Sequence, residues 1–338
     1  MKIQKEQLRK ALEIVKPGLA NKEIAEQTSS FAFIDGFVVT YNDSISIRHP
    51  IGDIGLNGAI RAEKLYKLLT KIKRDEIEIQ IDEKELTIMT GKAVAKLAIE
   101  AEITMPILDM KKIMKKFQDL PDNFSRNLRF AMQSCSRDMS KPVLTAVHIR
   151  ENGAFEGSDG FRLSRIRGDG MPCPDFLLPA DTAAQVAKLN PIRIHLQEAW
   201  VHFQNEEGSI ISSRILEDDV YPLVDHIFDF KGEKLQLPKA IADILDRATI
   251  FSSDSDHFLD QKVDVQIEDN SVVVSGECST GSYAETAKMR YEGNPIKFAM
   301  TPHLFKDIMT ETHECIVGEG RIKFTGENWE YLGMLKND

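Results

Sequence analysis

The chain has 338 residues, too many for one compact core and enough for two or three domains of roughly 100–200 residues each. Hydrophobic residues at 42% and charged residues at 28% are typical of a globular protein, which excludes a disordered chain. The net charge of −10 argues against nucleic-acid binding only if the charge is evenly spread, because phosphates attract clustered Lys and Arg.

The four cysteines are far apart and form no CxxC pair; they are Cys135, Cys173, Cys278 and Cys315. This pattern favours reduced thiols over a disulfide framework or a zinc site. The first residues read as a strand that enters an amphipathic helix, not as a secretory signal. The sequence contains no run of about 18 apolar residues, so it predicts no membrane span. We therefore expect a soluble, cytoplasmic protein with no membrane partner.

The first third of the sequence predicts two amphipathic helices, at residues 4–15 and from residue 62 to 72, and a hairpin. Their apolar faces consist of Leu8, Ala11, Leu12 and Val15, and of Leu65, Leu68, Leu69 and Ile72. After the second helix, Ile77, Ile79 and Ile81 alternate with polar residues at the period of a strand. A polar turn at residues 82–85 then leads to Leu86 and Ile88, which completes the hairpin.

The same order of elements returns twice. Residues 124–134 and 238–250 predict helices, and the segments that start at Ala180 and Thr301 each predict a helix followed by a hairpin. Six helices in three pairs, each with alternating strands, predict three copies of one α+β domain. The predicted domains are 1–118, 119–232 and 233–338, although chance similarity between α+β segments remains the alternative.

Basic residues gather on the polar side of several predicted helices. On the helix that starts near residue 62 these are Lys64, Lys67 and Lys71, with Arg61 and Lys73 at its ends. The other members are Arg9 and Lys16 on the first helix, and Arg126 and Arg129 on the helix at 124–134. Solvated side chains are the alternative for any one helix. Repetition on several helices favours contacts with phosphates that do not read base sequence.

The sequence contains few signs of an active site. The motifs GxxxxGK[ST], HExxH, GxSxG and GxGxxG are absent. The best metal-like cluster is Asp254, Asp256, His257 and Asp260, which lacks the glycine and distal Glu of an EF-hand and is better read as an exposed polar loop. His195 and His202 are read as surface or packed residues. We expect no enzyme activity, no cofactor and no metal.

Segments along the whole chain resemble the bacterial DNA sliding clamps, the beta subunits of DNA polymerase III, although the likeness is divergent. They are residues 58–99, residues 140–166, FLLPADTAAQVAKL with ISSRILEDDVYPLV, LPKAIADILDRATIFSS with VDVQIEDNSVVVSGE, and YLGML. Residues 140–166, similar to the family's RPILTGV…TDGHRL, are the most specific. The resemblance implies three domains, each a helix pair backed by antiparallel sheets, and two chains closed head-to-tail into a ring with the helices inside.

The resemblance also implies a function. Such a ring is a processivity factor that encircles double-stranded DNA, tethers the DNA polymerase to it and is opened by a separate ATP-driven clamp loader. A clamp-like scaffold for transcription or recombination stays open as an alternative, and an α+β small-molecule hydrolase or transferase is less favoured. A cellular and a phage origin also stay open.

Two sets of site residues follow from the resemblance. Loop contacts with DNA fall on Lys22 and Lys141. A site for a short partner peptide, called here the partner-peptide site, comprises Leu144, Ser158, Gly160, Phe161, Arg162, Leu163, Pro222, His226, Ile227, Leu332, Gly333 and Met334. An extended peptide would seat apolar side chains there.

Several positions depart from the family pattern. Phe161 stands where a His is usual, His226 where an Arg is common, and Leu-Gly-Met where the family has a Met-Pro-Met-like run. Asn337 and Asp338 extend the usual C-terminus. Ala180 and Asp181 replace a basic pair, and the helix at 238–250 carries Asp243 and Asp246, so DNA contact by these two helices is in doubt.

Overall fold

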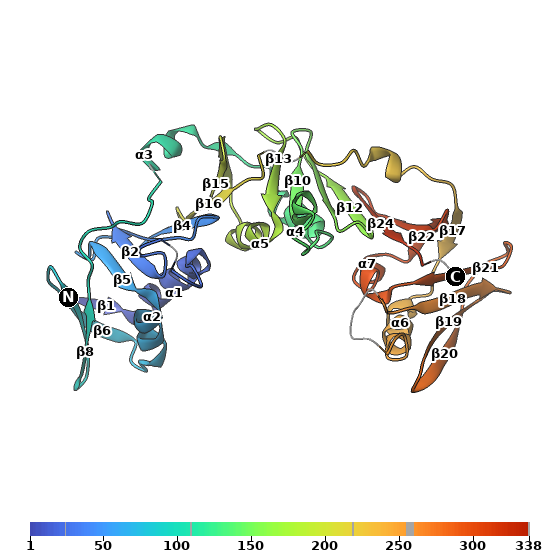
Figure 1. Ribbon diagram of the computed structural model, residues 1–338, viewed down its shortest axis with the longest axis horizontal. Coiled ribbons are helices and arrows are strands. Elements are labelled where there is room, and N and C mark those ends of the chain that lie inside the picture. Colours follow the sequence, from blue (N-terminus) through green and yellow to red (C-terminus); the bar gives the residue numbers. More distant parts are fainter. Residues whose placement is uncertain (24, 109, 218–219, 255–259, 337–338) are drawn as a thin grey trace. The chain divides into compact units, whose positions relative to one another are not determined.

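The structure, a computed structural model, describes the chain apart from residues 24, 109, 218–219, 255–259 and 337–338. The described residues form two compact units, Met1–Arg126 with Gly170–Glu217, and Asn127–Asp169 with Asp218–Asp338. Figure 1 labels the helices and strands and colours the chain in sequence order. The boundaries after residues 118 and 232 stay predictions.

The first unit is built from helices on antiparallel sheets. Its helices are α1 (Lys5–Val15), α2 (Ala62–Lys71), α3 (Met110–Ile113) and α5 (Ala180–Leu189), the last preceded by β13 (Phe176–Pro179). One sheet has the order β1 (Lys2–Gln4), β6 (Glu76–Ile81), β7 (Glu85–Thr90), β8 (Ala93–Ala98). The other has the order β5 (Gly58–Arg61), β2 (Ser30–Ile34), β3 (Phe37–Tyr41), β4 (Ile45–Pro50), β16 (Ile210–Arg214), β15 (Trp200–Gln204), β14 (Arg193–Gln197), β9 (Gln118–Asp119).

One continuous sheet joins the first and middle thirds of the sequence. Strand β4 pairs with β16, which places Ile47 opposite Ile211. A strand that pairs with another segment on each side leaves no free backbone groups to solvent, so the junction is as well bonded as the rest of the sheet.

The predicted helix pair of the first unit is confirmed. Leu12 of α1 and Leu65 and Leu69 of α2 are fully buried. Helix α1 packs on α2 and on strands β3 and β4. Helix α2 ends one residue before Ile72, and the predicted hairpin follows as β6 and β7, with Ile79 opposite Ile88. The apolar periods read from the sequence therefore mark the buried faces.

The second unit repeats this construction. Its helices are α4 (Phe124–Met132, which begins in the first unit), α6 (Ile241–Thr249) and α7 (Ile308–Glu311). One run of paired strands is β10 (Ala146–Ile149), β11 (Ala154–Ser158), β12 (Arg162–Arg167), β24 (Trp329–Met334), β23 (Arg321–Thr325), β22 (Glu314–Gly318), β17 (Glu233–Gln236). A four-stranded sheet has the order β20 (Gly281–Lys288), β19 (Ser271–Cys278), β18 (Val263–Glu268), β21 (Ile296–Met300).

The predicted helix after Thr301 is wrong in part. Leu304, Phe305 and Ile308 are all buried, as expected. The backbone, however, forms a 3-10 turn at Pro302–Leu304 and only a short helix, α7. The Tyr331 hydroxyl donates to the Leu304 carbonyl, the acceptor that a continuous helix would offer to the Ile308 amide. Packing against β24 therefore overrides the local helix pattern.

Among the described residues, no helix is long and apolar enough to cross a membrane.

Candidate DNA interface and partner-peptide site

Helix α2 carries the predicted basic stripe on its exposed side. Lys64, Lys67 and Lys71 are exposed, opposite the buried Leu65 and Leu69. Lys67 Nζ lies 2.5 Å from Glu63 Oε1, an ion pair in which both side chains are mostly exposed. Lys64 and Lys71 form no ion pair with any residue that the structure describes. The stripe is therefore net positive and open to an anion.

Helix α1 is closer to neutral than the sequence suggested. Arg9 lies between Glu6 and Glu13, at 2.7 and 2.8 Å. These two carboxylates raise the pKa of Arg9 and also neutralise its charge locally. Lys16, just after the helix, lies over the Tyr66 ring of α2 with its Nζ 4.6 Å from the ring centroid. Lys16 is thus held beside the α2 stripe.

The basic residues around α2 differ in their surroundings. Arg61, the residue before the helix, pairs with Glu23 and lies 3.8 Å from Glu100. Lys73 follows the helix and is exposed, as is Lys22 in the loop after α1. The structure therefore leaves the positive charge of Lys73 and Lys22 more open to solvent than that of Arg61.

Helix α4 presents two arginines on one side. Arg126 and Arg129 are exposed and one turn apart, whereas Phe124 and Leu128 are buried. Lys141, exposed in the loop after the helix, precedes a 3-10 turn at Pro142–Thr145. Each of the three predicted residues thus lies on the surface of its own element.

Helix α6 carries little free positive charge. Arg247 binds Glu285 of β20 at 2.8 Å, and Asp246 pairs with Lys306. Asp243 adds a negative charge in its first turn. Helix α5 starts with Ala180 and Asp181, where an acid interacts favourably with the positive end of the helix dipole.

The first part of the partner-peptide site is the tight turn between β11 and β12. The Asp159 carboxylate accepts hydrogen bonds from the amides of Phe161 and Arg162, both at 2.9 Å, and from Arg162 Nε at 2.9 Å. The Ser158 hydroxyl donates to the Arg162 carbonyl at 2.7 Å. Gly160 has φ +89°, a conformation that a residue with a side chain rarely adopts. The turn is therefore rigid.

The C-terminal strand adds the second part of the site. In the pairing of β12 with β24, Arg162 lies opposite Gly333 and Leu163 opposite Leu332. The Met334 amide donates to the Phe161 carbonyl at 2.8 Å. Phe161 and Met334 are 43% and 49% exposed, unusual for residues of this size. They form an accessible apolar pair at the end of a rigid sheet.

The third part comes from the connector, defined as residues 220–230, between β16 and β17. Pro222 and His226 are exposed and Ile227 is half-buried. Arg321 of β23 donates to the Ile227 carbonyl at 3.1 Å, which ties the connector to the same sheet as Leu332. Leu144 is half-buried, and its carbonyl accepts from the Ser136 amide at 2.8 Å.

Two further features lie beside this site, and no sequence pattern predicted them. Val220 and Leu223 of the connector are 90% and 81% exposed. Buried charges, Glu156 on β11 and Arg165 on β12, lie in the sheet next to it. The sequence pattern indicates neither feature. Apolar residues beside Tyr221 are typical of a buried core, and charged residues on an alternating strand are typical of the exposed face.

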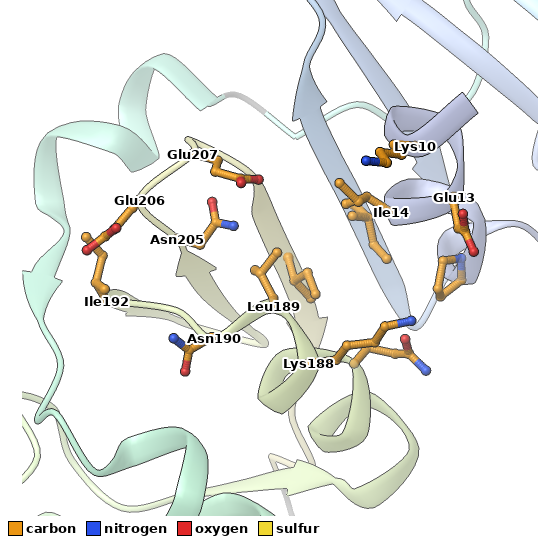
Figure 2. A pocket seen from close by; sticks show the side chains of 14 residues that line it. Lys10, Glu13, Ile14, Lys188, Leu189, Asn190, Ile192, Asn205, Glu206 and Glu207 are labelled. Carbon is orange, nitrogen blue, oxygen red and sulfur yellow. The ribbon is translucent and has the colours of Figure 1, made fainter. Parts of the chain in front are cut away.

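A cavity of about 630 Å³ lies in the first unit between α1 and the C-terminal end of α5 (Figure 2). Ile47 and Ile211, from paired strands, contribute apolar surface to it. Its charged lining residues are Lys10, Glu13, Lys188, Glu206 and Glu207. None of the predicted site residues lines it, and its mixture of charges selects no single class of ligand.

The two histidines are packed residues. His202 is 1% exposed, and its Nδ1 lies 2.7 Å from the Ser212 hydroxyl. His195 stacks on His202, with ring centroids 5.9 Å apart. Among the described residues, no group of His, Cys, Asp or Glu is arranged to hold a metal ion. Asp256 and His257 of the metal-like cluster lie outside the described residues, as do Asn337 and Asp338.

No family model and no curated protein sequence matches the chain. Solved structures, in contrast, match the chain over its whole length. The structure of a sliding clamp (DNA polymerase III subunit beta) from Bartonella birtlesii, bound to griselimycin, matches with a TM-score of 0.84 at 16% sequence identity, and the match covers 100% of this chain and 99% of that one. The DNA polymerase III subunit beta from Pseudomonas aeruginosa matches with a TM-score of 0.83 at 15% sequence identity, and the match covers 99% of each chain. The sliding clamp from Bacillus subtilis matches with a TM-score of 0.82 at 17% sequence identity, and the match covers 100% of this chain and 98% of that one. The chain therefore has, over its whole length, the fold of the bacterial DNA polymerase III beta subunits, the sliding clamps.

Proposed function

We propose that the chain is a DNA sliding clamp, a non-enzymatic ring of two copies that encircles duplex DNA and tethers a replicative polymerase. The observation that carries this proposal is the whole-chain clamp fold, which covers 99% or more of this chain in each of the three comparisons above. Fold alone does not determine function, so the site residues must support it separately.

The helix faces support contact with DNA. Lys64, Lys67 and Lys71 on α2 and Arg126 and Arg129 on α4 are exposed basic residues in a chain of net charge −10. In a clamp these helices would face the duplex. Ion pairing reduces the positive charge at Arg9 and Arg61. A modest attraction to phosphates suits a ring that slides, because closure around the DNA keeps it bound.

Free sheet edges support closure into a ring. Strand β8 is the last strand of its sheet in the first unit, and β20 is the last strand of its sheet in the second. An edge strand has unpaired amide and carbonyl groups and readily pairs with another chain. A head-to-tail dimer would join β8 of one copy to β20 of the other at each of its two contacts, which closes the ring.

The partner-peptide site supports tethering. Its exposed apolar pair, Phe161 and Met334, lies on the rigid end of paired strands, and Pro222 and His226 are exposed nearby on the connector. The peptide that binds there would come from the polymerase and, in turn, from an ATP-driven clamp loader. A clamp-like scaffold would use the same site for a transcription or recombination protein.

The test is topological. The protein is mixed with a linear plasmid, the ends are ligated, and the complex is passed through a sizing column in high salt. We expect retention on the closed circle and loss after a restriction enzyme cuts it, because only a threaded ring is held without ionic contacts. Equal loss from circular and linear DNA would reject the clamp. Polymerase stimulation separates a processivity factor from a scaffold.

A further inference from the structure

A buried pair of charges lies in the second unit, in the sheet that carries the partner-peptide site. Glu156 of β11 and Arg165 of β12 are opposite each other and are 1% and 2% exposed. Arg165 Nε donates to Glu156 Oε1 at 2.7 Å. A buried ion pair loses its hydration, so apolar residues of similar volume would stabilise this sheet as well or better. Stability alone therefore gives no reason for the pair.

Arg165 also reaches the connector. Its Nη2 lies 2.7 Å from Asp225 Oδ1 and 2.7 Å from Glu156 Oε1. Both are charge contacts without the alignment of a hydrogen bond. The Arg165 guanidinium also lies over the Phe228 ring, 4.6 Å from its centroid. One buried side chain thus contacts two connector residues, one on each side of His226 and Ile227.

Glu156 holds the start of the connector through a histidine. His148 Nδ1 lies 2.9 Å from Glu156 Oε2, and the His148 ring stacks on Tyr221 with centroids 4.7 Å apart. Tyr221 is 6% exposed, and its hydroxyl has no hydrogen-bond partner among the residues that the structure describes. Stacking and packing, not a hydrogen bond, therefore hold Tyr221 in place.

The anchored residues alternate with the predicted peptide contacts. Tyr221 and Phe228 are buried, whereas Pro222 and His226, between them, are exposed. The connector's only regular structure among the described residues is a 3-10 turn at Asp225–Ile227. A segment with so few internal hydrogen bonds takes its conformation from its anchors. The buried charge cluster, defined as His148, Glu156 and Arg165, holds three anchor residues of the connector: Tyr221, Phe228 and the exposed Asp225.

We propose that the buried charge cluster holds the connector in the conformation that presents Pro222, His226 and Ile227 to a bound peptide. Arg165 and Asp225 are then positioning residues, since neither belongs to the predicted contacts. A connector released from the cluster would have to be ordered during binding, and that ordering lowers affinity. The inference rests on the proposed function for its peptide, but the anchoring itself is a property of the free protein.

The first test measures hydrogen exchange of residues 220–230 in the full-length protein. Asp225→Asn removes the connector's charge from Arg165, and we expect exchange of this segment to rise about tenfold. Asp229→Asn is the matched control, because Asp229 is an exposed acid on the same connector with no ion pair among the described residues; exchange should stay unchanged. Asp225→Glu keeps the charge and should restore protection. Wild-type protection in Asp225→Asn would overturn the proposal.

A second variant keeps the core filled. Glu156→Gln with Arg165→Met removes both buried charges without leaving one unpaired. We expect a cooperative unfolding transition close to that of the wild type, together with faster exchange of residues 220–230 than in Asp225→Asn. An unfolded double variant would mean that the pair serves the fold, and that result would overturn its assignment as a positioning device.

Binding gives the functional readout, with griselimycin as the probe. Phe161→Ala with Met334→Ala first establishes whether the probe uses the partner-peptide site. If it does, Asp225→Asn should weaken binding about tenfold and Asp229→Asn should not. A released connector with unchanged affinity would overturn the positioning role. A wild-type chain that does not bind griselimycin would count against the proposed function, while the exchange experiment would still decide the anchoring.

Discussion

His202 shows how burial changes the chemistry of a single residue. It lies on β15 with 1% exposure. Burial lowers its pKa to about 4, and the nearby His195 contributes to the shift. His49 and His195 of the same unit also have pKa values lowered mainly by burial. The first unit therefore contains histidines that are neutral when folded and ready to accept protons when unfolded.

We predict that acid destabilises the first unit before carboxylates titrate. A His in the unfolded chain has a pKa near 6.5, so below that pH the unfolded chain binds a proton that the folded chain does not bind. The stability that the neutral histidines contribute is fully present above pH ~6.5 and decreases as the pH drops. For His202 alone, the free energy of unfolding falls by about 3 kcal/mol near pH 4. Urea unfolding measured at pH 7 and pH 5 should show this loss, and His202→Gln should reduce it. An unchanged pH dependence in His202→Gln would contradict the prediction.

The pKa of Glu156 is lowered like those of the histidines, but the fold holds Glu156 in its charged form, whereas it holds the histidines neutral. Burial raises its pKa, but the hydrogen bond with His148 and the charge of Arg165 outweigh burial and leave it lowered. A lowered carboxylate pKa stabilises the fold above the unfolded value and loses that contribution as pH falls below it. The charged form of Glu156 is therefore the one that the fold holds.

At the scale of elements, the approach of α4 to β11 depends on Gly157. A Cβ atom at this position would lie 2.1 Å from the Ala131 carbonyl oxygen, which is backbone and cannot rotate away. We predict that Gly157→Ala destabilises the second unit by about 1–3 kcal/mol, because the helix must move off the sheet. Urea unfolding measures the change. Wild-type stability would show that α4 tolerates a wider separation.

Helix α2 is the element on which DNA contact can be tested most directly. Replacing Lys64, Lys67 and Lys71 by Glu should leave the helix folded, because its core face is untouched. Each lost phosphate contact reduces the salt dependence of DNA binding by about one unit of slope. Binding to duplex DNA, measured against salt concentration, should therefore weaken and flatten.

The matched control for this triple change uses exposed lysines of strands and loops in the second unit. Lys231, Lys234 and Lys297 are exposed and lie on no helix. Their replacement by Glu makes the same change in net charge. If both triple variants weaken DNA binding equally, total charge and not the α2 stripe is responsible.

At the scale of the whole molecule, the proposed ring depends on the edge strand β8. Val94 on this strand is 59% exposed, which is unusual for a valine in a sheet. We predict that Val94→Glu converts a dimer to a monomer of 38.2 kDa, because a charge would be buried at the joined edges. Light scattering measures the mass.

Val220→Glu is the matched control, since Val220 is 90% exposed on the connector and belongs to neither edge strand. It should remain a dimer. A wild-type chain that is already monomeric at all concentrations would count against the ring itself, not only against the role of β8.

The sequence alone determined most of the secondary structure. Residues with a clear apolar period, such as Leu65 and Leu69 or Ile77 and Ile79, form the helix and strand faces that they predict. The period works there because one face of each element meets the core and the other meets water. The repeat of helix and hairpin could be predicted for the same reason, whereas the clamp fold was implied by the resemblance of segments along the chain to the bacterial sliding clamps.

Three features of this protein depend on contacts between elements and could not be predicted from the local sequence pattern. The helix after Thr301 is interrupted because Tyr331, distant in sequence, binds the Leu304 carbonyl. Arg9 looks like a free cation in the sequence but is paired with Glu6 and Glu13. Glu156 and Arg165 look like surface charges, yet they meet across two strands in the core. In each case a contact between elements, which has no period in the sequence, sets the outcome.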